Sequence, residues 1–190
     1  MYQKNRKLII IIHILVSCYF LPSMTYAQEQ GSTSFNLSEH QDKSSYRDIV
    51  RLLYKKEYSK TYPEYGVSIL NGKEEIWEIS SFDDEKQIWI IESYHDGAFY
   101  REVYYSKNGV LLYAIDSDRY IKENSIGDNI WECEFFIKDG KIYSEISLGH
   151  GKTERDDWDP NIIFKMFDKR KKELSILQNN KGKKCKINMS

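Results

Sequence analysis

The sequence lacks the short motifs that identify several enzyme classes. It contains no Gly-x-Ser-x-Gly nucleophile motif, no His-Glu-x-x-His zinc motif and no glycine-rich phosphate-binding loop. No pair of cysteines has the spacing of a zinc site, and the Asp-x-Asp-x-Asp-Gly spacing of a calcium loop is missing. The sequence therefore gives no support for catalysis, without excluding an enzyme, and we expect no cofactor, no metal ion and no catalytic residue.

Cysteine is scarce, at three in 190 residues. Two of the three, Cys133 and Cys185, follow the N-terminal segment. Cys133 lies within a strand pattern and is predicted to be a small buried apolar residue, whereas Cys185 lies in a polar tail. Their spacing specifies no partner, so a disulfide between them stays open.

Long hydrophobic runs are absent except at the N-terminus, where residues 1–27 are typical of a secretory signal peptide. Basic residues precede an apolar run over Leu8–Phe20, and Ala27 ends a cleavage site before Gln28. The run is about 13 residues long, short of the roughly 20 that cross a bilayer. An alternative cleavage precedes Cys18, because the Leu-Val-Ser-Cys sequence there resembles a bacterial lipobox. We predict an exported protein, periplasmic or secreted, or a lipoprotein anchored through Cys18.

Charge is distributed unevenly. Three of the 28 basic residues and none of the 29 acidic ones precede Gln28, which leaves the mature chain with 25 basic and 29 acidic residues. Residues 165–190 contain nine basic and two acidic residues, so a basic tail follows an acidic body. We expect a solvated, frayed end over 179–190, no nucleic-acid partner, and a membrane contact only if Cys18 is lipidated.

The mature chain opens with a polar stretch, 28–43, that has no periodicity and is predicted to be a flexible lead-in. A helix is expected from Ser44, where Ser45 can cap its first turn. Its predicted apolar face is formed by Tyr46, Ile49, Val50, Leu53 and Tyr58.

From Glu64 to Leu148 the hydrophobic period changes to two and β-forming residues dominate. Asn71-Gly72, Asn108-Gly109 and Asp139-Gly140 favour tight hairpin turns. A sequence in the second of these hairpins, Tyr104–Leu111, recurs in the third, and it resembles the hairpins of MORN-type repeat proteins. The resemblance covers two short stretches and implies no function.

Two-residue turns fix a predicted register. Around Asp139-Gly140 they set Ile137 opposite Ile142 and Trp131 opposite Leu148, on an apolar face shared with Cys133 and Phe135. The other face holds Glu132, Glu134 and Glu145, with Glu134 directly opposite Glu145. Around Asn108-Gly109 they set Arg101 opposite Asp116 as an ion pair, and Tyr104 opposite Tyr113.

Asp159-Pro160 predicts the start of a closing helix whose apolar stripe is Ile163, Met166, Phe167, Leu174 and Leu177. The predicted fold is therefore α+β, an antiparallel meander of about six or seven strands with a helix at each end. A small β-barrel is the alternative. The expected divisions are a signal peptide at 1–27, the lead-in at 28–43, one β-rich domain at 44–178 and the basic tail at 179–190.

Candidate binding residues lie in three places. Like charges at Glu134 and Glu145, beside Glu132, favour a basic partner. His150, Asp156 and Asp157 lie in a long irregular loop, Gly149–Asp159, of the kind that carries function. Tyr104 and Tyr113 are candidates for an aromatic patch that contacts sugar or protein.

These features favour a non-catalytic exported domain that binds another macromolecule of the cell envelope, for example an inhibitor or a toxin-neutralising protein. One alternative is an exported hydrolase that uses His150 and the acidic loop. Another is a carrier of a small lipophilic ligand, because several strands are apolar on both faces.

The signal-peptide interpretation predicts processing between Ala27 and Gln28. An intact-mass measurement of the protein purified from its native host should give a chain that begins at Gln28 and carries no lipid. A chain that begins at a diacylated Cys18 would instead establish the lipoprotein alternative.

Overall fold

The computed structural model describes residues 37–60, 62–70, 72–82, 85–120, 129–180 and 185–187. All of them belong to one compact unit, Asn36–Ser190. The predicted cleavage sites at Ala27 and before Cys18, and the first part of the predicted lead-in, lie outside the described residues.

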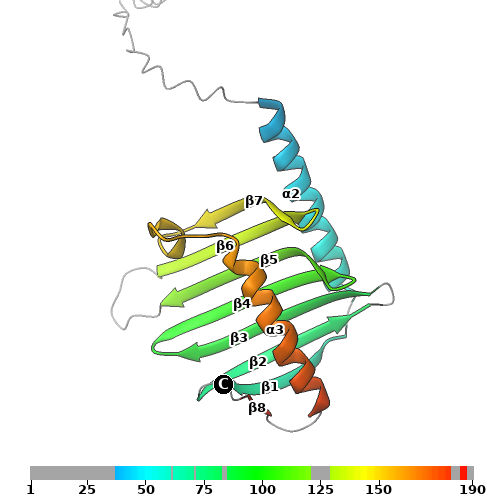
Figure 1. Cartoon of the computed structure of the whole chain (residues 1–190), viewed down its shortest axis with the longest axis vertical. Helices are drawn as coiled ribbons and strands as arrows, with labels where there is room; N and C mark the ends of the chain where they lie inside the picture. The colour runs from blue at the N-terminus through cyan, green and yellow to red at the C-terminus, as the bar shows by residue number, and fades with distance from the viewer. Residues whose placement is uncertain are drawn as a thin grey trace, which may run out of the picture. The chain divides into compact units, whose positions relative to one another are not determined.

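One open sheet contains all the described strands (Figure 1). Seven antiparallel strands follow one another as a meander: β1 (Glu64–Leu70), β2 (Lys73–Ser81), β3 (Lys86–His95), β4 (Ala98–Lys107), β5 (Val110–Tyr120), β6 (Asn129–Lys138) and β7 (Lys141–Leu148). The predicted meander is confirmed, and the alternative of a small barrel is wrong, because β7 lies at one edge of the sheet and does not pair with the other.

The tail contributes a strand where the sequence suggested a frayed end. The short strand β8 (Cys185–Ile187) pairs in parallel with β1 and forms the second sheet edge. Cys133 is a free, buried cysteine in β6, six strand positions from β8. At about 4.8 Å per strand this separation is roughly 25–30 Å, far beyond the reach of a disulfide. Cys133 and Cys185 of one chain therefore do not pair.

Two helices lie on opposite faces of the sheet: α2 (Leu37–Tyr58) behind it and α3 (Ile162–Asn179) in front of it (Figure 1). The helix α2 begins seven residues before Ser44, and an ion pair of 2.8 Å between Glu39 and Lys43 supports this first part. Its inward face is Tyr46, Val50 and Tyr54, whereas the other residues expected on that face are exposed: Ile49, Leu53 and Tyr58.

Each helix covers a separate apolar core. Under α3, Trp77, Trp89 and Phe135 pack against Phe167 and its neighbours on the helix. Under α2, residues of β3 to β6 pack against Val50, with Tyr46 and Tyr54 at the margin. A helix on each side therefore explains why the central strands are apolar on both faces.

Two β-bulges shift the register from the one predicted. In β5 the extra residue is Leu112, because Leu111 pairs with Ser106 while Tyr113 pairs with Tyr105. In β7 the extra residue is Tyr143, because Ile142 pairs with Ile137 as predicted, while the next pair joins Ser144 to Phe136. Each bulge places two residues opposite one and moves all later pairs by one position.

The predicted pairs beyond the bulges are therefore wrong. Arg101 lies opposite Ser117 rather than Asp116, and Tyr104 lies opposite Ala114 rather than Tyr113. Glu134 lies opposite Ile146 rather than Glu145, and Trp131 no longer lies opposite Leu148. The alternation along β6 is unbroken, so its predicted core face is confirmed: Trp131, Cys133, Phe135 and Ile137 are all buried.

The two faces of β6 predict different mutational effects. Trp131→Ala and Phe135→Ala should each lower the free energy of unfolding by about 3–5 kcal/mol, since each leaves a cavity in the core under α3. Glu132→Ala, on the half-exposed opposite face, should change it by less than about 0.5 kcal/mol. Urea unfolding followed by circular dichroism measures both. A larger loss for Glu132→Ala than for Phe135→Ala would contradict this assignment of faces.

Candidate functional site

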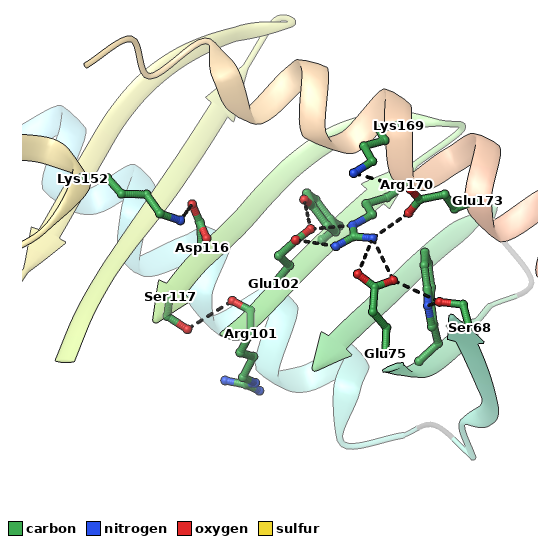
Figure 2. A network of polar contacts seen from close by, with 12 residues as sticks. Ser68, Glu75, Arg101, Glu102, Asp116, Ser117, Lys152, Lys169, Arg170 and Glu173 are labelled. Carbon is green, nitrogen blue, oxygen red and sulfur yellow. Dashed lines mark hydrogen bonds and ion pairs between the residues drawn. The ribbon is translucent and has the colours of Figure 1, made fainter. Parts of the chain in front are cut away.

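A buried charged network lies between α3 and the sheet, centred on the guanidinium of Arg170 (Figure 2). Arg170 donates two hydrogen bonds to Glu102 of β4, from Nε at 2.9 Å and from Nη2 at 2.7 Å. Its Nη1 reaches Glu75 of β2 at 3.0 Å and Glu173 of α3 at 2.6 Å. One side chain thus connects the helix to two strands that are not neighbours.

Further donors surround these carboxylates. The hydroxyl of Ser68 donates to Glu75 at 3.0 Å and accepts from Trp77 Nε1 at 2.9 Å. The hydroxyl of Tyr104 donates to Glu102 at 2.6 Å. Burial raises the pKa of Glu102, but the hydrogen bonds and the charge of Arg170 outweigh it, so the pKa lies below its ordinary value. The Glu102 carboxyl is therefore ionised at neutral pH.

A second, partly buried ion pair joins the loop to β5. Lys152, in the short 3₁₀ helix η1 (Lys152–Glu154), lies 2.8 Å from Asp116 and 3.8 Å from Asp118. Its ammonium also lies over the ring of Trp131, 4.7 Å from the centroid. Burial raises the pKa of Asp116, and the charge of Lys152 only partly offsets this effect. The pair fixes the loop against the α3 side of the sheet.

Two glycines allow the loop to lie directly against β6. Gly149 has φ +77°, and a Cβ there would lie 1.8 Å from the carbonyl oxygen of Ile130. A Cβ on Gly151 would lie 2.3 Å from the ring of Trp131. Asp159 accepts a hydrogen bond of 3.0 Å from the backbone amide of Asn161, and α3 begins just after it, two residues later than the sequence suggested.

The candidate residues of this loop have different partners and do not form one cluster. His150 is fully in solvent, with a side chain 95% exposed, and its Nδ1 lies 2.6 Å from Glu154. Asp157 accepts two hydrogen bonds from Arg155, at 2.9 Å and 2.8 Å. Asp156 is exposed. Among the described residues no cluster of His, Cys, Asp and Glu side chains could hold a metal ion.

The sheet surface beside α2 is a further feature, one that the sequence did not indicate. The contacts of α2 lie near the ends of the strands that carry the β4–β5 and β6–β7 turns, for example Tyr54 with Tyr113 and Arg51 with Glu134. The other half of this face is uncovered by the described residues. We call it the open face; it comprises Ile76, Glu92, Tyr94, Phe99, Arg101, Ser117, Arg119, Ile130, Glu132 and Leu148, which the register places side by side.

The open face is apolar at its margins and charged at its centre. Ile76, Tyr94, Ile130 and Leu148 are 51%, 63%, 46% and 62% exposed. Between them, Arg101 and Glu92 form an ion pair of 3.3 Å across β3 and β4. A sheet face that meets only water rarely exposes this many apolar side chains beside its charged ones.

The acidic and aromatic candidate residues do not lie together on one surface. Glu132 lies on the open face, half-buried, while Glu145 lies opposite Phe135 on the α3 side. Glu134 is paired with Arg51 and accepts from the hydroxyl of Tyr113. Tyr104 and Tyr113 are buried on opposite sides of the sheet, so they form no common surface patch.

No protein-family model, no curated protein and no solved structure matches this chain. In the described part of the chain, neither helix has the length and apolarity needed to span a membrane.

The Arg170 network predicts acid sensitivity. Glu102 has a folded pKa below its ordinary value of 4.5, so the stability it contributes is present above that value and is lost as the pH falls through the folded pKa. Glu102→Gln should lower the free energy of unfolding at pH 7 by about 1–3 kcal/mol. The difference from the wild type should shrink below about pH 4.5.

Urea unfolding at a series of pH values measures this difference. Asp156→Asn, which changes an exposed carboxylate, is the matched control and should leave the curve unchanged. If the free energies of unfolding of wild type and Glu102→Gln differ by the same amount from pH 7 to the acid limit, Glu102 does not have a lowered pKa in the folded state.

Proposed function

We propose that this protein is an exported, non-catalytic domain that binds a partner protein of the cell envelope through the open face. The observation that carries the proposal is the exposure of Ile76, Tyr94, Ile130 and Leu148 on a sheet surface that α2 leaves uncovered. Several exposed apolar side chains around one surface mark an interaction site, because their burial against a partner is favourable.

The composition of the open face supports a protein partner. Protein interfaces combine aliphatic and aromatic side chains with arginine, and they place polar groups around them. Tyr94 and Phe99 lie opposite each other on β3 and β4, next to the Arg101–Glu92 pair. Strands packed on their other face against α3 hold these side chains in fixed positions, which reduces the entropy lost on binding.

No particular feature favours the two alternatives. His150 and Glu154 form a hydrogen-bonded pair, but both side chains are exposed to water and lie outside the cavity that the structure shows. The apolar faces of the central strands, which suggested a lipophile carrier, are packed against the helices.

The test is capture of a partner from the protein's own envelope fraction with mature wild type and with two variants, Ile130→Glu and Leu148→Glu. Each variant places a charge on an exposed apolar position, so folding should be preserved while affinity for the captured protein falls by at least about tenfold. Binding of the purified partner is measured by calorimetry.

Val110→Glu is the matched control, since Val110 is 51% exposed and lies outside the open face. It should bind as the wild type does. If Ile130→Glu, Leu148→Glu and Val110→Glu all lose the same affinity for the partner, or if none of them loses any, the open face is not the interface. A catalytic activity abolished by His150→Ala with unchanged thermal unfolding would replace the proposal with the hydrolase.

A further inference from the structure

A cavity of about 370 Å³ lies on the α3 side of the sheet, away from the open face. Its wall is formed by Asp116 of β5, by the loop and by the first turns of α3, which contribute Lys165 and Met166. Its volume is within the range of small-molecule sites in proteins. It is thus a second candidate site, independent of the proposed protein interface.

The charges that line the cavity are already matched. Asp116 pairs with Lys152 at 2.8 Å. Asp157 pairs with Arg155 through two hydrogen bonds, and Asp159 accepts from the backbone amide of Asn161. With Lys165, the lining contains three carboxylates and three cations and has no net charge. A ligand with a net charge would therefore find no excess of the opposite sign.

The polar part of the wall suits hydroxyl groups. A hydroxyl both donates and accepts, so it can bond to a carboxylate and to a guanidinium without breaking the pair between them. Arg155 and Asp157 present such a pair, and both side chains are well exposed, at 66% and 72%. Neighbouring hydroxyls on a ring match this arrangement of adjacent donors and acceptors.

The apolar part of the wall suits a ring with C–H faces. Trp158 lines the cavity and is held in place by Trp131 and Phe135, with ring centroids 6.0 Å and 6.2 Å away. Ile162 and Met166 of α3 complete the apolar surface. A pyranose carries both features, an apolar C–H face and a rim of hydroxyls.

The geometry points to a binding site for a neutral saccharide, of one or two rings, in the cavity between the Gly149–Asp159 loop and the start of α3. The ring lies against the apolar wall of Trp158 and Met166, and its hydroxyls bond to the Arg155–Asp157 pair. This site goes beyond the proposed protein interface, since the two share no residue and lie on opposite faces of the sheet.

The experiment is calorimetric titration of the full mature protein with neutral probes, namely glucose, galactose, mannose, N-acetylglucosamine and its β-1,4-linked disaccharide. At least one should bind saturably. Arg155→Ala and Asp157→Asn should each weaken that binding by about tenfold, the loss of one charge-assisted hydrogen bond. Both positions are exposed, and unchanged thermal unfolding verifies the fold.

His150→Ala is the matched control, because it alters the same loop outside the cavity, and it should leave saccharide affinity unchanged. Leu148→Glu, which tests the protein interface, should also leave it unchanged, so the two proposals fail separately. No saturable binding of any probe up to about 50 mM would overturn the inference. So would tighter binding of phosphate or glycine than of every saccharide, or equal affinity in wild type, Arg155→Ala and Asp157→Asn.

Discussion

The contact of the Arg170 guanidinium with three carboxylates is the interaction on which the arrangement of this domain depends. It is the point where α3 is joined to both β2 and β4, through Glu75 and Glu102. Buried charges stabilise a structure only when they are paired and hydrogen-bonded, and loss of one partner leaves the others uncompensated. Because α3 covers the larger core and carries part of the cavity wall, the geometry of the cavity depends on the position that this network gives the helix.

The two helices cover the sheet unequally, and this difference separates the two candidate sites. The orange helix α3 runs diagonally across its face in Figure 1, from the loop beside β6 toward β1. The helix α2 remains near one end of the strands, where Arg51 meets Glu134 and Tyr54 meets Tyr113. Within the described residues, α3 covers one face beside the cavity at its start, and α2 covers only half of the other face.

Hydrophobic periodicity and turn residues were sufficient to predict the meander, its hairpin turns, both helices and the core face of β6. They were insufficient for the register, because nothing in Leu112 or Tyr143 distinguishes a bulged residue from a paired one. They also missed the Arg170 network, because a charged residue is ordinarily assigned to the surface. A signal was present: Arg170 falls on the same helical stripe as Phe167 and Leu174, and Glu102 alternates with the buried Tyr104.

The two bulges decide which residues each candidate site contains. With a regular hairpin, Leu148 would lie opposite Trp131, on the α3 side, and Asp116 would lie opposite Arg101, on the α2 side. The extra residue Tyr143 moves Leu148 to the open face, opposite Glu132. The extra residue Leu112 moves Asp116 to the α3 side, where it meets Lys152 and lines the cavity. A one-residue insertion reverses the side on which every later residue of a strand lies, so both sites depend on the bulges.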